Sequence, residues 1–377
     1  KAGIIPTPAV AYLAKHYNAD AGIVISASHN TFEYNGIKFF NGNGYKLDDL
    51  LEEKIEDIII SSINVNSHIT GDKIGKCLEA EENATGLYVK HLLDTVDYSL
   101  RGKKIVLDCA NGAAFQIAEK IYRELGAEVI VIGNQPNGVN INDGCGSTHP
   151  ERMAETVKMS GADIGLAFDG DADRLIVADE QGKVIDGDRV IAICARMLKT
   201  EGRLAQNKVT ATVMSNIGFH KAMEESGIEV DVTGVGDRYV LEQMLKTGCV
   251  IGGEQSGHII FREYTTTGDG ILSSLQFIKA VLNSGKKPSE LAAEVEIFPQ
   301  VLVNARINND YKKTYMNDPE IADAISEIEK TMDGSGRVLI RPSGTEPLVR
   351  VMLEGEDEKE LFDMARQLAD LIERKLK

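Results

Sequence analysis

Short apolar runs alternate along much of the chain with segments whose apolar residues recur every three or four positions. Residues 104–109 are predicted to form a buried strand, residues 117–125 a helix, and residues 128–132 the next strand. A similar alternation returns over residues 190–232. Because a helix between two strands normally connects them in parallel, the pattern predicts an α/β fold with helices covering parallel sheets.

The last part of the chain has a different pattern. Strands are predicted over residues 301–307, 337–341 and 348–353, and a helix over residues 320–331. The closing helix carries one apolar stripe, formed by Leu361, Ala365, Leu368, Ile372 and Leu376. These elements predict a smaller C-terminal α+β domain.

Charged or turn-rich segments divide the chain near residues 80, 185 and 298. Length alone, 377 residues at roughly 150 per domain, gives two to three domains. The boundaries instead predict three related α/β domains and a smaller fourth one, over residues 1–82, 83–185, 186–298 and 299–377. Because Lys1 already stands in sequence that looks structured, we expect the first domain to be incomplete at its N-terminus.

Four polar loops each follow a short apolar strand. They are SASHN (residues 26–30), DGDAD (169–173), GEQSGH (253–258) and RPSGT (341–345). Because α/β sheets present ligands at the carboxyl ends of their strands, we expect the four loops to form one composite site.

The loop at residues 169–173 holds Asp169, Asp171 and Asp173. Carboxylates this dense repel one another unless a cation neutralises them, and their hard oxygen atoms suit magnesium or calcium. A calcium EF-hand fails because Arg174 stands where that loop requires glycine. A solvated acidic turn and a phosphatase with an aspartate nucleophile, Asp169, remain open alternatives.

The loop at residues 26–30 offers a hydroxyl, Ser28, beside an imidazole, His29. Alone, such residues more often cap a helix or form an Asx-turn than act as a nucleophile. Beside a metal site the loop suits phosphoryl transfer, because a phosphorylated Ser28 would carry about −1.5 to −2 charges and could complete the ligand shell of a magnesium ion.

Two further loops carry groups that suit ligand binding. The RPSGT loop, followed by Arg350, combines guanidinium groups with hydroxyl and backbone donors that suit a phosphate, although a hairpin with surface arginines is the plainer interpretation. The GEQSGH loop presents Glu254, Ser256 and His258, an inventory that suits sugar hydroxyls. A lone histidine such as His258 is more often structural than catalytic.

Composition excludes several classes of partner. Lys and Arg total 41 against 58 Asp and Glu, and the net charge of −17 argues against nucleic acid or anionic lipid as a partner. No apolar stretch approaches the roughly 20 residues of a membrane span. Five scattered cysteines suit a reduced cytoplasm. P-loop and GxGxxG spacings are missing from the sequence, so ATP and NAD are not implied.

Five motifs in order resemble the α-D-phosphohexomutase superfamily. Besides the four loops, with NGIKFF (residues 35–40) after the first and Arg174 after the second, VGDRYV (235–240) belongs to the set. The resemblance extends from Gly3 to the C-terminus. It implies a heart-shaped molecule of four domains with the site in a central cleft. The family's opening TDGIRG-type motif has no counterpart, and Thr31 stands where many members have proline.

The resemblance also implies roles for individual residues. Ser28 matches the phosphoserine, and the three aspartates match the ligands of a Mg²⁺ cofactor. Lys38, His258 and His29 are the candidates for proton transfer and catalysis. Substrate contacts are expected from Arg174, Glu254, Ser256, Arg341, Ser343, Gly344, Thr345 and Arg350.

The implied reaction interconverts two phosphosugars through a phosphoserine enzyme and a 1,6-bisphosphate. Gln255 and residues 236–239 favour the branch that converts glucosamine 6-phosphate and glucosamine 1-phosphate, feeding UDP-N-acetylglucosamine and cell wall precursor synthesis. A phosphomannomutase or phosphoglucomutase is the alternative within the superfamily, and a metal-dependent phosphatase or a non-catalytic sugar-phosphate-binding protein lies outside it. A cytoplasmic monomer or homodimer is expected.

Overall fold

The computed structural model describes residues 1–61, 71–80, 83–311, 314–332, 335–343 and 346–377. These residues form two compact units. The first contains Lys1–Met214 and Ser226–Glu294, and the second contains Ser215–Glu225 and Val295–Lys377. Within the described residues, no helix is long and apolar enough to cross a membrane.

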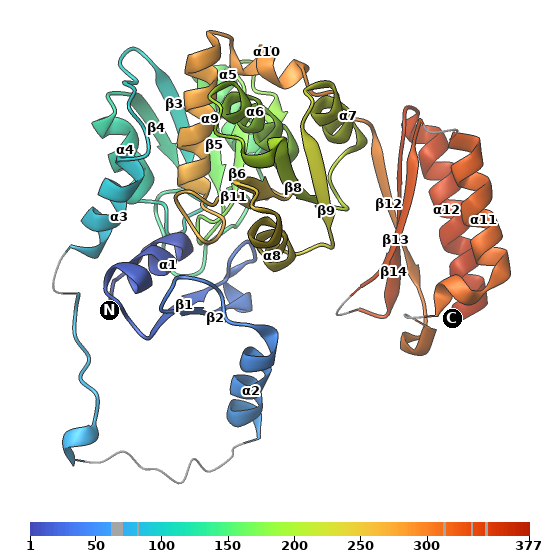
Figure 1. The fold of residues 1–377 in the computed structure, drawn as a ribbon, viewed down its shortest axis with the longest axis horizontal. Helices are drawn as coiled ribbons and strands as arrows, with labels where there is room; N and C mark the ends of the chain where they lie inside the picture. The colour runs from blue at the N-terminus through green and yellow to red at the C-terminus, as the bar shows by residue number, and fades with distance from the viewer. Residues whose placement is uncertain (62–70, 81–82, 312–313, 333–334, 344–345) are drawn as a thin grey trace. The chain divides into compact units, whose positions relative to one another are not determined.

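The first unit begins with a helix packed on an antiparallel strand pair (Figure 1). A helix start at Thr7 is favoured by Pro8 in the first turn, where proline costs no hydrogen bond. The Asp48 side chain caps the next helix by accepting the Leu51 N–H. The elements are α1 (Thr7–His16), β1 (Ala21–Ser26), β2 (Gly36–Asn41), α2 (Asp49–Ile60) and α3 (Ala84–Leu93).

A second sheet follows with strand order β4, β3, β5, β6, β7. Strand β3 runs parallel to β4 and β5, as predicted, but β6 and β7 are antiparallel additions. The antiparallel part arises because residues 169–174 are too few for a crossover connection and leave only a tight hairpin between β5 and β6. The elements are β3 (Lys104–Asp108), α4 (Ile117–Glu124), β4 (Glu128–Ile132), α5 (Glu151–Ser160), β5 (Ile164–Phe168), β6 (Leu175–Ala178) and β7 (Val184–Ile185).

The third sheet has strand order β11, β10, β8, β9. Its strand β8 is parallel to β9 and β10, while β11 returns antiparallel to β10. Asp186 and Asp269 cap the two long helices of this region. The elements are α6 (Gly187–Thr200), β8 (Lys208–Thr212), α8 (Asp237–Thr247), β9 (Glu229–Thr233), β10 (Ile251–Gly253), β11 (Ile259–Phe261), α9 (Gly270–Ser284) and α10 (Pro288–Ala293).

The second unit is the predicted α+β domain with one helix added from earlier in the chain. Its antiparallel sheet has strand order β12, β14, β13, and two helices lie side by side over one face (Figure 1). The predicted stripe of the last helix is buried in this core. The elements are α7 (Ile217–Glu225), β12 (Gln300–Arg306), α11 (Pro319–Met332), β13 (Arg337–Pro342), β14 (Leu348–Glu354) and α12 (Glu358–Leu376).

Glu354 fastens helix α7 to this sheet. Its fully buried carboxylate accepts the Ile217 N–H at 3.1 Å and the Arg337 Nε–H at 2.6 Å. Arg337 also donates to the Ser215 carbonyl at 2.5 Å. Burial raises the pKa of Glu354, and the Arg337 guanidinium opposes that shift.

Replacing Glu354 by Ala is expected to lower the free energy of unfolding by about 2 to 4 kcal/mol. The change removes the carboxylate that pairs with the Arg337 guanidinium and accepts the Ile217 N–H at the start of α7. Urea denaturation followed by circular dichroism measures the loss. Glu356→Ala, at an exposed position two residues further on, serves as the control. Equal losses in the two variants would contradict this account of Glu354.

Candidate active site

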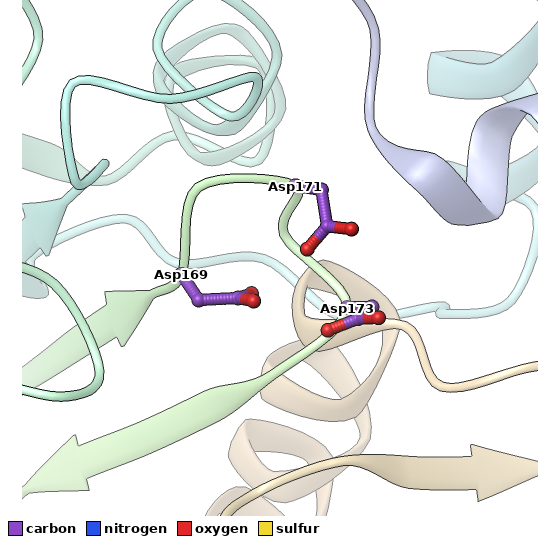
Figure 2. A group of neighbouring side chains, drawn as sticks. All are labelled: Asp169, Asp171 and Asp173. Atoms are coloured by element: carbon purple, nitrogen blue, oxygen red, sulfur yellow. The ribbon is translucent and has the colours of Figure 1, made fainter. Parts of the chain in front are cut away.

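The three aspartates occupy the hairpin turn between β5 and β6. Each side chain is buried, and one carboxylate oxygen from each lies within 4.8 Å of the others. Figure 2 shows the three carboxylates turned toward the same space inside the turn. Burial raises the pKa of Asp169, and the neighbouring Asp173 and Asp171 raise it further. Three carboxylates buried this close together can all be ionised only when a cation neutralises their charge.

The hydrogen-bond pattern of the turn fits a metal ion. Asp169 Oδ2, Asp171 Oδ1 and Asp173 Oδ1 are buried and have no hydrogen-bond partner among the described residues. Buried polar atoms are normally paired, so a set of orphaned oxygens indicates a missing ligand. Because all three are hard carboxylate oxygens, the ligand that suits them is a divalent cation of the magnesium or calcium type.

Ser28 is held directly against this turn. Its backbone adopts a left-handed conformation with φ +54°, which non-glycine residues rarely adopt outside constrained sites. The Ser28 carbonyl accepts the Gly170 N–H at 3.0 Å and the Asn142 side-chain amide at 2.9 Å. A Cβ at Gly170 would stand 2.6 Å from that carbonyl oxygen, so glycine permits the close approach. These contacts therefore fix Ser28, the candidate phosphoserine, beside the candidate metal site of the aspartate turn.

Lys38, on β2, links the two groups. Its Nζ donates to Asp171 Oδ2 at 2.5 Å and lies 3.4 Å from both Asp173 Oδ2 and Ser28 Oγ. Burial disfavours the ammonium, but the charges of Asp173 and Asp171 outweigh it and raise the pKa of Lys38. Lys38 is thus a cation fixed at the hydroxyl that would carry the phosphoryl group.

His258 also lies close to the turn. Its Nε2 accepts the Gly268 N–H at 3.2 Å and stands 3.9 Å from Asp173 Oδ2 and 3.6 Å from Asp237 Oδ2. Asp237 in turn binds Lys46. Burial disfavours the Asp237 carboxylate, but neighbouring cations, the bound Lys46 among them, overcome this and lower the pKa of Asp237 to about 2. His258 is therefore buried in a charged network at the edge of the aspartate turn.

The remaining first-unit candidates differ in their contacts with the turn. The Arg174 N–H donates to Asp169 Oδ1 at 3.0 Å, and Glu254 Oε1 accepts the Gly236 N–H at 3.2 Å. Ser256 is exposed. Burial lowers the pKa of His29, and Arg174 adds to this effect. Among contacts between described residues, none joins His29 to the Ser28 hydroxyl.

The phosphate-loop candidates belong to the second unit. Arg341 is the fifth residue of β13, in agreement with the strand predicted over residues 337–341. It stands directly opposite Arg350 across the β13 and β14 ladder, which places the two arginines on one face of the sheet. The Ser343 hydroxyl accepts the Glu346 N–H at 3.2 Å. Gly344 and Thr345 lie outside the described residues.

Two site residues escaped sequence reasoning. Thr7, the first residue of α1, is fully buried and donates its hydroxyl to Asp171 Oδ2 at 2.8 Å. Asn142 donates to the carbonyls of Ser28 and Asn30, the latter at 2.6 Å. Both are common polar residues, and neither stands in a sequence motif typical of metal ligands or nucleophiles. The sequence therefore contains no signal that points to them.

The buried Asp269 near this site gives a pH prediction. Its carboxylate accepts the Tyr88 hydroxyl at 2.7 Å and the Leu272 N–H at 2.9 Å, and burial raises its pKa from 3.8 to about 6. A raised carboxyl pKa contributes stability that is present below about pH 4 and is lost as pH rises through about 6.

The Asp269→Asn variant is expected to remove that loss. Relative to wild type, its free energy of unfolding should rise between pH 4 and pH 7 by at most about 3 kcal/mol. Urea denaturation of both proteins at several pH values measures the difference. A difference that is constant across this range would contradict the raised pKa.

Comparison with known proteins agrees with this geometry. Sequence profiles of the phosphoglucomutase/phosphomannomutase family match in order: alpha/beta/alpha domain I at residues 1–65, domain II at 87–182, domain III at 186–298, and the C-terminal domain at 302–371. Together, the three α/β/α domains, the C-terminal domain and the buried aspartate turn define the phosphohexomutase class.

Similar sequences narrow the assignment. The phosphoglucosamine mutase of Thermoanaerobacter sp. (strain X514) is 58% identical over 374 residues, and that of Clostridium kluyveri is 56% identical over 374 residues. Each alignment covers 99% of this chain and 83% of the relative. The chain belongs to the phosphoglucosamine mutase family, whose members are isomerases of the phosphohexomutase superfamily.

Solved structures share the fold. A phosphoglucomutase/phosphomannomutase family protein from Burkholderia thailandensis has a TM-score of 0.78 at 22% identity, covering 100% of this chain and 83% of its own. An Aspergillus fumigatus N-acetylphosphoglucosamine mutase, solved with GlcNAc-6P and magnesium, has a TM-score of 0.67 at 18% identity and covers 98% and 93%. At these identities the likeness concerns the fold alone.

Proposed function

We propose that this chain interconverts glucosamine 6-phosphate and glucosamine 1-phosphate through a phosphorylated Ser28. The observation that carries the proposal is the position of the Ser28 hydroxyl, 3.4 Å from a Lys38 ammonium that itself binds Asp171. Phosphoryl transfer requires mainly positioning and charge neutralisation, and both are built into this contact.

The proposed cofactor is magnesium held by Asp169, Asp171 and Asp173. The three orphaned carboxylate oxygens support it, and the magnesium in the Aspergillus relative supports the choice of ion. When bound, magnesium would neutralise charge on the phosphoryl oxygens. An oxygen of phosphorylated Ser28 would add a further hard ligand.

In the proposed reaction, one phosphoryl group moves from Ser28 to the sugar. A sugar hydroxyl oxygen forms a bond to the phosphorus of phospho-Ser28, and the bond from Ser28 Oγ to phosphorus breaks. Lys38 stabilises the departing Oγ by donating to it, which its 3.4 Å separation permits with little movement. We assign the acceptance of the sugar hydroxyl proton to His258 or His29. The 1,6-bisphosphate then returns its other phosphoryl group to Ser28.

We assign a phosphosugar as the substrate. We assign the sugar hydroxyls to Glu254 and Ser256, and a phosphate contact to Arg174. The opposed Arg341 and Arg350 support the assignment of the non-reacting phosphate to the second unit. Ser343, Gly344 and Thr345 complete that proposed phosphate clamp. The five free thiols suit a cytoplasmic enzyme.

Intact-mass measurement tests the proposal. Purified protein incubated with magnesium and glucose 1,6-bisphosphate, used as a phosphoryl donor, should gain the mass of one phosphate, and peptide mapping should place it on Ser28. The Ser28→Ala variant is the control and should gain none. Phosphate mapped to Asp169, or to no residue while turnover continues, would overturn the phosphoserine scheme.

A further inference from the structure

A cavity of about 470 Å³ lies in the first unit, apart from the aspartate turn. It is bounded by the C-terminal half of α1, the turn after β2, helix α3 and residues 262–266. A volume of this size can hold a small organic ligand. None of the residues assigned to catalysis or to the phosphosugar lines it.

One wall of the cavity is a stack of aromatic rings. Tyr12 stacks on His91 at 4.3 Å between centroids and on His16 at 5.7 Å, with interplanar angles of 16° and 25°. His91 Nε2 pairs with the Tyr264 carbonyl at 3.1 Å, and burial lowers the pKa of His91, so its ring stays neutral. His16 is exposed, and the Tyr17 ring contacts it in a T-shaped arrangement with 5.4 Å between the centroids, so the stack reaches the surface at these rings, where another planar ring can join it.

The cavity is also cationic. Lys15 and Arg262 line it, and among the described residues no carboxylate lies within ion-pair distance of either. Arg262 is fixed by donating to the Cys249 and Gly248 carbonyls at 2.8 and 3.0 Å. The acidic residue in the lining, Glu263, is bound by Arg203 at 2.6 Å. Lys15 and Arg262 are thus two cationic side chains that form no ion pair with the described carboxylates. In a chain of net charge −17, such a pair suits an anionic ligand.

The walls of the cavity continue into the catalytic site. Thr266 donates to the Gly44 carbonyl, joining the turn after β2 to residues 262–266. Two residues beyond Gly44, Lys46 binds Asp237, and two residues beyond Thr266, the Gly268 N–H donates to His258. A ligand that braces these two segments would therefore act on the surroundings of His258.

We propose that this cavity is an effector site for a nucleotide. The base stacks on His16 at the end of the aromatic wall, and the phosphates bind Lys15 and Arg262. Nucleotide binding to this cavity does not depend on the proposed function. The effect of the nucleotide on turnover rests on the proposed function, because it requires the mutase reaction.

Calorimetry on the full chain tests binding, with UDP and ADP as probes and glucosamine 6-phosphate present at saturation to fill the phosphosugar site. We expect binding that Lys15→Gln weakens at least tenfold and that His16→Ala also weakens. Lys158→Gln is the matched control, because Lys158 is likewise an exposed lysine in the last turn of a helix. Inorganic pyrophosphate, which has no ring, should bind at least tenfold more weakly than UDP.

Several outcomes would overturn the proposal. They are the absence of nucleotide binding, equal affinities in the Lys15→Gln and Lys158→Gln variants, and pyrophosphate binding as tight as that of UDP. Saturating UDP should also change kcat for glucosamine 1-phosphate in wild type but not in Lys15→Gln. An unchanged kcat despite measured binding would overturn the effector role, and a protein that binds UDP but lacks mutase activity would instead contradict the proposed function.

Discussion

Ser28→Ala is expected to lower turnover of glucosamine 1-phosphate by at least about 10⁴-fold while substrate affinity changes little. The variant lacks the oxygen that carries the phosphoryl group, and in the described part of the chain no other hydroxyl contacts the Lys38 ammonium. The groups assigned to sugar and phosphate binding are untouched. Product formation followed by phosphorus NMR measures turnover, and calorimetry measures affinity.

Ser26→Ala provides the contrast for this variant. The Ser26 hydroxyl accepts the Ser28 N–H at 2.9 Å and so helps to hold the strained Ser28 backbone. Its loss should slow turnover by only about tenfold, because the phosphoryl carrier remains. Substantial activity in Ser28→Ala, or losses of equal size in both variants, would contradict the role assigned to Ser28.

Asp169→Asn is expected to weaken magnesium binding at least about 100-fold and turnover at least about 10³-fold. Asp169 Oδ1 accepts the Arg174 N–H, whereas Oδ2 is the orphaned atom. Asparagine can keep the first contact with its amide oxygen, which places an N–H₂ group where an oxygen ligand is needed. The fold should therefore persist while the metal site is lost.

Asp179→Asn is the matched control for the metal site. Asp179 is also a buried aspartate in a hairpin turn of the same sheet, and its Oδ1 accepts the Gln181 and Lys183 N–H groups. Its replacement should leave magnesium affinity unchanged, as measured by calorimetry. Unaltered affinity in Asp169→Asn, or an equal loss in Asp179→Asn, would contradict the assignment of the aspartates as ligands.

Sequence reasoning worked best where the chemistry is local. The three aspartates lie within five residues and follow an apolar strand, so their density alone predicted a cation site, and the structure buries them together. Lys38 came from the family resemblance rather than from any pattern, yet its ammonium lies between Ser28 and Asp171. The contact between Lys38 and Asp171 joins residues that are 133 positions apart in the sequence, so it depends on how the folded chain packs.

Where prediction failed, tertiary contacts decided the outcome. Thr7 and Asn142 reach the site from separate elements, and neither stands in a pattern that marks a ligand. The predicted strands over residues 337–341 and 348–353 already contain Arg341 and Arg350, but only the register of the antiparallel ladder places the two arginines opposite each other. Helix α7 joins the second unit through the buried Glu354, whose isolated position in sequence gives no sign of that contact.

The most direct test of the central claim follows the phosphoryl group itself. Enzyme labelled with ³²P on Ser28 is mixed with unlabelled glucosamine 1-phosphate and magnesium, and the products of single turnovers are separated. The account predicts that label leaves the protein first as glucosamine 1,6-bisphosphate and then appears in glucosamine 6-phosphate. Label released as inorganic phosphate at the rate of turnover, or retained on the protein while glucosamine 6-phosphate forms, would contradict it.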